Sequence, residues 1–118
     1  MLFIEYPKCT TCRKARKWLE EHKLEFEARH IQETPPKLSE LKKWNKLSGL
    51  PLRKFFNTCG QKYRELNLKD RLGDMSEKQQ YDLLASDGMI VKRPILVTED
   101  KVLVGFKESE WEETLLGK

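Results

Sequence analysis

The sequence has no long hydrophobic run, no internal repeat and no low-complexity tract. No stretch approaches the roughly 20 apolar residues of a membrane helix, and the opening segment MLFIEYPK has no signal-peptide pattern. We therefore expect a cytoplasmic chain that does not enter a membrane. No linker-like segment interrupts the 118 residues, a length that suits one compact unit, so we expect a single domain over residues 1–118.

Cysteine and histidine are scarce, with three of the first and two of the second. An odd number of cysteines in a reducing compartment does not suit a disulfide framework. A zinc site is disfavoured because the sequence has one C-x-x-C pair, and Cys59, His22 and His30 lack the spacing of further ligands. We expect no bound metal.

Charge of one sign is not concentrated anywhere along the chain. The 23 basic and 19 acidic residues give a net charge of +4, and lysine and arginine mostly alternate with glutamate and aspartate. A nucleic-acid binder usually gathers its basic residues on one face. The pattern favours a solvated charged surface, and we expect no direct nucleic-acid binding.

Apolar residues predict a βαβ unit in the first third of the chain. Leu2–Tyr6 is a short apolar run typical of a buried strand, and Phe26–Ile31 alternates apolar and polar residues like a second strand. Between them, residues 11–23 show helical spacing. The apolar face of that helix is formed by Ala15, Trp18, Leu19 and His22. A strand–helix–strand unit of this length has parallel strands.

Residues 34 to 86 are predicted to be mostly helical. Thr34 followed by Pro35 is typical of a helix start, and Gly49 of a helix end. Ser76, with a glutamine three residues later, forms a capping-box pattern that opens another helix.

The chain ends with two strands and a helix. Ile90–Val97 and Val102–Phe106 are β-branched, apolar runs joined by a short polar turn, which predicts an antiparallel hairpin. An amphipathic helix is predicted over Glu108–Leu116. The order βαβ, helices, ββα predicts an α/β protein of the thioredoxin-like fold, with a helical insertion at about residues 34–86.

Cys9 and Cys12 form a C-x-x-C pair at the start of the first predicted helix. A thiol at a helix N-terminus faces unpaired N–H groups and the positive end of the helix dipole, which favour the thiolate. Lys8 and Arg13 add positive charge in the sequence around it. We expect Cys9 to be the nucleophile and Cys12 to resolve the mixed disulfide that Cys9 forms.

Two other interpretations of the cysteines remain. The pair could be inert core residues, although its place between a strand and a helix does not suit that role. Cys59, beside Gly60 in a predicted loop, could be a distal resolving thiol or an incidental one, and composition favours the incidental thiol.

Several segments together resemble the arsenate reductase (ArsC) and Spx family over nearly the whole chain. The resemblance is carried by YPKCTTCRKARKWLEEH, KRPILV and VGFKESEWEETL, and by LRKFFNTCGQKYRELNLKDRL and LLASDGM, which are similar to an arsenate-reductase-related bacterial branch. The resemblance implies a thioredoxin-like fold with the first cysteine, Cys9, as nucleophile.

The resemblance also gives a role to Arg93 and Pro94. In thioredoxin-like folds a cis proline precedes the third strand and faces the cysteine motif, which would bring Arg93 to the thiolate. An arginine there could stabilise the thiolate or bind an oxyanion through paired hydrogen bonds. Without the resemblance, Pro94 indicates only the start of a strand.

Three functions diverge within the resembled family. Arsenate reductases coupled to glutaredoxin use one cysteine and three arginines, of which this chain matches Cys9 and Arg93. At the other two arginine positions it offers Phe55 or Lys54, and Phe106 or Lys107. A lysine does not reproduce the bidentate clamp of an arginine.

Spx proteins use C-x-x-C as a redox switch and bind the C-terminal domain of the RNA polymerase α-subunit around a glycine, near which Gly49 lies; this chain ends soon after the last predicted helix, without the longer basic tail of Spx. The third function is a glutaredoxin-like thiol–disulfide reductase, which uses both cysteines. We expect a thiol-dependent oxidoreductase, with an Spx-like regulator or an arsenate reductase as alternatives.

The thiols themselves would carry the electrons, so no bound cofactor is expected. Glutathione, a small thiol or thioredoxin would supply the electrons. The expected partners are this reductant and a disulfide substrate, with RNA polymerase, through its α-subunit, as partner under the regulator alternative. We expect a monomer.

Overall fold

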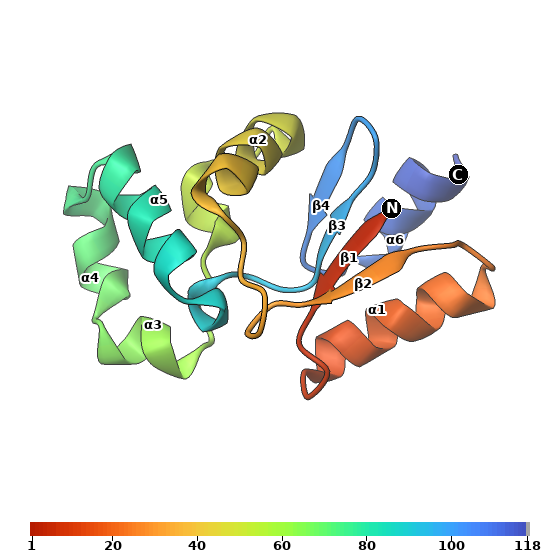
Figure 1. The fold of residues 1–118 in the computed structure, drawn as a ribbon, viewed down its shortest axis with the longest axis horizontal. Coiled ribbons are helices and arrows are strands. Elements are labelled where there is room, and N and C mark those ends of the chain that lie inside the picture. Colours follow the sequence, from red (N-terminus) through yellow and green to blue (C-terminus); the bar gives the residue numbers. More distant parts are fainter. Residues whose placement is uncertain (118) are drawn as a thin grey trace.

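The computed structural model describes residues 1–117, which form a four-stranded sheet flanked by helices (Figure 1). The strands lie in the order β2-β1-β3-β4. β1 and β2 are parallel, whereas β3 pairs antiparallel with both β1 and β4. The strands are β1 (Leu2–Glu5), β2 (Glu27–His30), β3 (Ile95–Val97) and β4 (Val102–Val104). This is the arrangement that a βαβ half followed by a ββα half predicts.

One face of the sheet is covered by α1 (Thr10–Glu21) and by α6 (Glu108–Trp111), which continues as a π-helical turn over Glu112–Leu116. Side chains of alternate strand residues meet both helices in one apolar cluster. The cluster consists of Phe3, Ala15, Trp18, Leu19, Leu96, Leu103 and Trp111. His22, assigned to the apolar face of the helix by its spacing, is exposed just after the end of α1, and its ring packs against that of Trp18 with centroids 4.2 Å apart.

The opposite face packs against α2 (Leu38–Ser48) through a second cluster, which also includes residues of the later helices. Ile4, Ile95 and Val102 are its members from the sheet. Leu41 and Trp44 of α2 are buried against them. The sheet therefore lies between two apolar clusters. One joins it to α1 and α6, and the other joins it to α2 and the later helices.

The helical segment between β2 and β3 consists of short elements after α2 (Figure 1). These are a 3₁₀ turn (Leu52–Phe55), α3 (Gln61–Glu65), α4 (Leu68–Arg71), a 3₁₀ turn (Leu72–Asp74), α5 (Glu77–Ser86) and a 3₁₀ turn (Gly88–Ile90). Two predicted helix boundaries are confirmed. Gly49 ends α2 in the left-handed conformation, with φ of 70°, and Ser76 and Gln79 exchange the two hydrogen bonds of a capping box at the start of α5.

The predicted helix start at Thr34 and Pro35 is wrong. The amide of Thr34 donates to the carbonyl oxygen of His30 at 2.9 Å, so Thr34 closes a turn after β2. The helix begins at Leu38, and Lys37 is its N-cap. Glu40 caps the N-terminus of α2, because its carboxylate accepts a hydrogen bond from the amide of Lys37 at 3.0 Å.

The two C-terminal strands are shorter than predicted. Of Ile90–Val97, only the last three residues form β3, because residues 88–90 form a 3₁₀ turn and Val91 makes an isolated bridge with Phe56. β4 ends at Val104, and Gly105, with φ of 78°, turns the chain towards α6.

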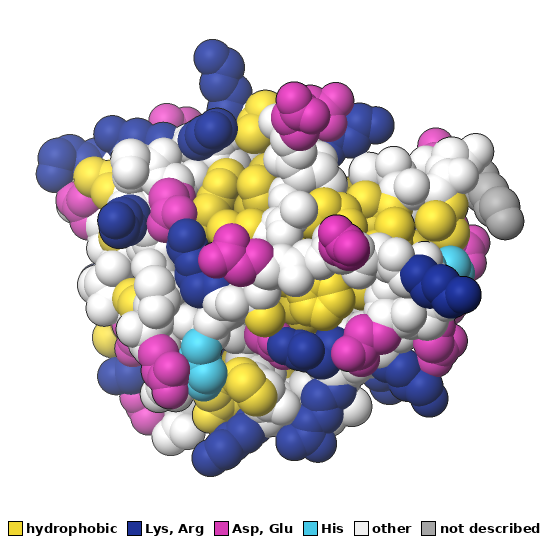
Figure 2. Space-filling model, turned by 45° about the vertical axis from the view of Figure 1, so that its right-hand side comes forward, with side chains coloured by type: hydrophobic (Ala, Val, Ile, Leu, Met, Phe, Trp, Pro, Cys, Tyr) yellow, Lys and Arg dark blue, Asp and Glu magenta, His cyan; other side chains and the backbone are white. Residues whose placement is uncertain are grey.

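The surface carries both signs of charge. Figure 2 shows basic and acidic side chains interspersed over one face, around a central group of hydrophobic side chains. Within residues 1–117, no helix has both the length and the apolar character needed to cross a membrane.

An ion pair joins β2 to α2 on the second face. Nη1 and Nη2 of Arg29 donate to the two carboxylate oxygens of Glu40 at 3.0 and 2.8 Å. The guanidinium also lies 5.8 Å from the ring centroid of Trp44. The hydrogen bonds from Arg29 hold the pKa of Glu40 below its ordinary value, with help from the amide of Lys37.

This pair predicts a pH-dependent effect of Glu40→Gln, which removes the charge and keeps an oxygen for the Lys37 amide. The ionised carboxylate stabilises the fold at pH values above its unfolded pKa of about 4.3, and this contribution is lost as pH falls through the lower folded pKa. At pH 7 the variant should lose roughly 1 kcal/mol of unfolding free energy. Urea unfolding should show the difference shrinking as pH falls below about 4. Glu21→Gln, at an exposed pair with Lys17, is the control. A loss that is independent of pH would contradict the prediction.

Candidate active site

Cys9 is the N-cap of α1, in extended backbone conformation directly before the first helical turn. Its amide donates to the carbonyl oxygen of Tyr6 at 2.9 Å, and its carbonyl oxygen accepts from the amide of Arg13 at 3.0 Å. The thiol does not cap the helix in the way a serine or aspartate would. The helix therefore begins with backbone N–H groups available to a sulfur anion.

The local environment favours the Cys9 thiolate. Partial burial by itself would raise the pKa of the thiol. The backbone amides of Cys12 and Thr11, the Cys12 thiol and the charge of Arg93 lower it. These groups together outweigh burial, so the pKa of Cys9 lies below that of an ordinary cysteine.

Cys12 has the opposite properties. Its side chain is completely buried in the first turn of α1, and its Sγ accepts a hydrogen bond from the amide of Tyr6 at 3.5 Å. Burial raises the pKa of Cys12 to about 12, and the neighbouring Cys9 charge adds to the effect. Both thiols are free in the structure. The pair is thus asymmetric, with an accessible acidic thiol and a buried protonated one.

Arg93 is brought to this pair from the far end of the sequence. The Arg93–Pro94 peptide bond is cis, as the family resemblance implied, and Pro94 is buried with its carbonyl oxygen bonded to the amide of Gly105 at 2.8 Å. The guanidinium carbon lies 5.1 Å from the ring centroid of Tyr6. Its charge acts on both cysteines and lowers the pKa of Cys9.

Lys8 and Arg13, the other predicted supporting residues, are exposed. Nε of Arg13 donates to the carbonyl oxygen of Pro7 at 2.8 Å, which closes the loop before α1. The positive side chain that acts on the Cys9 thiol is Arg93.

Cys59 is exposed in the loop before α3, where its carbonyl oxygen accepts a hydrogen bond from Arg64. Within residues 1–117, no three histidine, cysteine or acidic side chains gather as a metal site would require.

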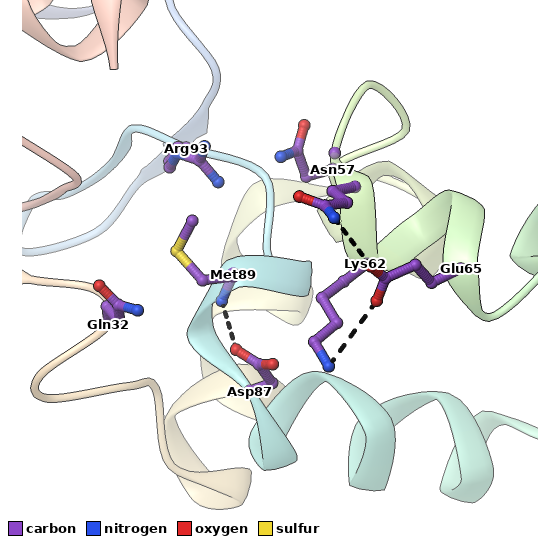
Figure 3. Close-up of a pocket in the computed structure, with 9 residues that line it drawn as sticks. Gln32, Asn57, Lys62, Glu65, Asp87, Met89 and Arg93 are labelled. Carbon is purple, nitrogen blue, oxygen red and sulfur yellow. Dashed lines mark hydrogen bonds and ion pairs between the residues drawn. The ribbon is translucent and has the colours of Figure 1, made fainter. Parts of the chain in front are cut away.

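A pocket of about 400 Å³ lies on the insertion side of Arg93 (Figure 3). Its lining residues are Gln32, Asn57, Gly60, Gln61, Lys62, Glu65, Asp87, Met89 and Arg93. Lys62 and Glu65 neutralise each other at 4.0 Å, and Asp87 accepts a hydrogen bond from the amide of Met89. Nε and Nη1 of Arg93 are buried and have no hydrogen-bond partner in the described chain. A molecule in this pocket would meet the side-chain amides of Gln32, Asn57 and Gln61, the carboxylate of Asp87 and the guanidinium of Arg93.

Two backbone hydrogen bonds place Arg93 relative to the insertion, and sequence reasoning missed them. Lys92 donates to the carbonyl oxygen of Phe55, and Asn57 donates to that of Ile90, both at 2.7 Å. Such a single bridge between a turn and a loop has no periodic sequence signal.

Gly88 is a second feature that the sequence did not reveal. The residue pair Asp87-Gly88 is typical of a helix stop, but Gly88 is also buried against the end of β2. A Cβ at this position would lie 2.0 Å from the carbonyl oxygen of Ile31. Only the absence of a side chain lets the two backbones approach this closely.

Tyr6 is predicted from the sequence only as the end of a strand, yet it contacts Cys9, Cys12 and Arg93. Its position three residues before Cys9 is the available signal, since the loop between them is too short to carry the ring far from the pair.

The chain is similar to bacterial proteins over almost its whole length. It is 59% identical to the uncharacterized protein YusI of Bacillus subtilis strain 168, with 96% of each chain covered. It is 33% identical to the regulatory protein MgsR of the same organism, with 93% of this chain and 86% of MgsR covered. The global transcriptional regulator Spx of Listeria innocua is 32% identical, with 88% and 78% covered.

Solved structures share the fold. An ArsC family related protein from Bacteroides fragilis superposes with a TM-score of 0.93 at 54% identity, covering 95% of this chain and 94% of that protein. A possible arsenate reductase from Streptococcus mutans UA159 gives 0.85 at 45% identity, covering 94% and 96%. These neighbours confirm the predicted thioredoxin-like α/β fold. The ArsC family model matches residues 4–114, and the chain therefore belongs to the ArsC family.

Proposed function

We propose that this protein is a thiol–disulfide oxidoreductase in which Cys9 is the nucleophile and Cys12 the resolving thiol. The observation that carries the proposal is the asymmetry of the pair. The lowered pKa of Cys9 supplies thiolate at an accessible helix N-terminus, whereas burial keeps Cys12 protonated until an adduct forms beside it.

The exchange proceeds in two steps, formation of a mixed disulfide at Cys9 and its resolution by Cys12. The Cys9 thiolate attacks one sulfur of a substrate disulfide, so that a Cys9–substrate disulfide forms and the other half leaves as a thiolate that takes a proton from solvent. Cys12 then attacks the Cys9 sulfur, the bond between Cys9 and the substrate breaks, and the second half of the substrate leaves as a thiolate that takes up the proton that Cys12 gives up. The pair is oxidised by two electrons to a Cys9–Cys12 disulfide, and the substrate disulfide is reduced to two thiols.

The cycle closes when an external dithiol, or two molecules of a monothiol such as glutathione, reduces the Cys9–Cys12 disulfide. Thioredoxin could serve as the dithiol. Arg93 would stabilise the Cys9 thiolate. The pocket that Arg93 lines offers side-chain amides that could bind the part of the substrate or reductant that extends away from the reacting sulfur. No organic cofactor enters this scheme.

Arsenate reduction is less well supported by the same site. At the positions where the family resemblance places two further arginines, Phe55 is completely buried, and Phe106 packs edge-on against Trp111 with ring centroids 4.9 Å apart. The alternatives, Lys54 and Lys107, are exposed. Arg93 alone does not form the multidentate clamp of an oxyanion.

The first test is to trap the intermediate with Cys12→Ser. Without a resolving thiol, the Cys9–substrate disulfide should persist. After incubation with hydroxyethyl disulfide, mass spectrometry should show one adduct at Cys9, whereas the Cys59→Ser control should resolve its adduct into a Cys9–Cys12 disulfide and keep no adduct there. An adduct that resolves as fast in Cys12→Ser as in the control would contradict the role of Cys12.

A second candidate function is a redox-responsive transcriptional regulator. It is favoured by the similarity to the regulatory protein MgsR and to the global transcriptional regulator Spx. The partner would be the C-terminal domain of the RNA polymerase α-subunit, and the exposed Gly49 at the end of α2 would lie in the contact surface. Stable, oxidation-dependent binding of the purified chain to that domain, without turnover of disulfides, would favour the regulator over the enzyme.

A further inference from the structure

Tyr6 lies where the two cysteines and Arg93 meet, although its side chain takes no part in the proposed exchange. Its carbonyl oxygen accepts a hydrogen bond from the amide of Cys9 at 2.9 Å, and its own amide donates to Sγ of Cys12 at 3.5 Å. Its ring faces the guanidinium of Arg93, whose carbon lies 5.1 Å from the ring centroid. One residue therefore contacts all three groups of the candidate site.

The Tyr6 ring is the contact that holds the charged end of Arg93. Nε and Nη1 of Arg93 are buried and form no hydrogen bond within residues 1–117, and in that range no carboxylate lies within ion-pair distance of the guanidinium. A cation over an aromatic face is attracted by the negative potential of the ring, and more strongly when water is excluded. The face of the Tyr6 ring thus fixes the guanidinium of Arg93, which has no ion-pair partner among the described residues.

The ring of Tyr6 is itself held in place. His30, at the end of β2, meets it edge-on, with ring centroids 5.7 Å apart and an angle of 89° between the planes. Nδ1 of His30 lies 3.2 Å from the amides of both Gln32 and Glu33, so the imidazole is fixed by the turn after β2. Tyr6 is therefore a firm support for Arg93.

We propose that Tyr6 is a positioning residue of the disulfide exchange, and that its ring face holds the Arg93 guanidinium beside the cysteine pair. This inference rests on the proposed function. Two charged or titratable side chains act on Cys9: Cys12, which lies on α1, and Arg93, which precedes β3. Lys8, in the loop before α1, and Arg13, on α1, are exposed. His30 faces Tyr6.

The test changes the electronic character of the ring at nearly constant shape. In a Cys59→Ser background, Tyr6 is replaced by phenylalanine and, separately, by pentafluorophenylalanine, whose ring face no longer attracts cations. The pKa of Cys9 is then measured from the pH dependence of its alkylation by iodoacetamide. Phenylalanine should leave that pKa unchanged. The fluorinated ring should raise it by roughly half a unit, which is about threefold less thiolate below the pKa.

The same two substitutions of Tyr6 are then made in an Arg93→Gln background, which completes a double-mutant cycle. There the two rings should give the same pKa for Cys9, because the cation they act on is absent. Equal pKa values for both rings with Arg93 present, or an equal shift without it, would overturn the positioning role and leave the proposed function intact. An ordinary cysteine pKa in the unsubstituted protein would overturn the proposed function itself, and the role of Tyr6 with it.

Discussion

Replacing Cys9 by serine should lower the rate of disulfide reduction by at least about a thousandfold. A serine hydroxyl fits the N-cap position well and can accept a hydrogen bond from the first turn of α1, so the fold should be retained. It does not ionise under the conditions that ionise Cys9, and an oxygen does not form the mixed disulfide with the substrate. The loss is measured as the rate at which hydroxyethyl disulfide is reduced in the presence of a reducing thiol, and this rate is monitored through the thiol product that is released.

Cys59→Ser is the matched control for this prediction, because it removes an exposed thiol that lies outside the pair. Its turnover should equal that of the unsubstituted protein. A Cys9→Ser protein that still reduces the disulfide would show that the cysteine pair is not the reaction centre, and a large loss in Cys59→Ser would move the resolving role away from Cys12.

Gly88→Ala should destabilise the protein by about 3 kcal/mol or more. The new Cβ would lie 2.0 Å from the carbonyl oxygen of Ile31 and 2.8 Å from its carbonyl carbon. Both are backbone atoms, which cannot rotate away as a flexible side chain would. The chain must therefore shift the turn at residues 88–90 or the end of β2, and either shift disturbs buried packing around Ile31 and Ile90. The midpoint of urea unfolding measures the effect.

Gly73→Ala is the control for Gly88→Ala. A Cβ at Gly73 meets nothing within 4 Å, and its φ lies outside the left-handed region. Alanine there should be neutral or slightly stabilising, since it reduces the freedom of the unfolded chain without strain. Equal stabilities of the two variants would contradict the close approach of Gly88 to β2.

The parts of the fold that the sequence predicted correctly are those with local causes. The capping box of Ser76, the left-handed Gly49 and the helical spacing of α1 each depend on residues within one or two turns. The helix N-terminus at Cys9 is a local feature of the same kind, whereas the roles of nucleophile and resolving thiol stay predictions. The start of α2 failed because Thr34 bonds back to β2, and the carboxylate of Glu40 supplies the cap instead.

The parts that the sequence did not predict depend on contacts between distant segments. Arg93 could be assigned to the site only through the family resemblance, since more than eighty residues separate it from Cys9. The aromatic contact of Tyr6 with Arg93 and the fit of Gly88 against Ile31 have no periodic or compositional signal. Such contacts arise from tertiary packing, which overrides local preference where the two differ.

The bridge between Phe56 and Val91 has a consequence for how this chain can change over evolution. Backbone hydrogen bonds tie residues 55–57 to residues 90–92 on both sides of the bridge, and Arg93 follows at once. An insertion or deletion close to either segment would shift the register and move Arg93 away from the cysteines. Length changes in the exposed turn at residues 73–76, which lies away from both segments, leave the register intact. Four of the nine residues that line the pocket beside Arg93 lie in α3 or directly before it, so the pocket can change there while Cys9 and Cys12 keep their positions.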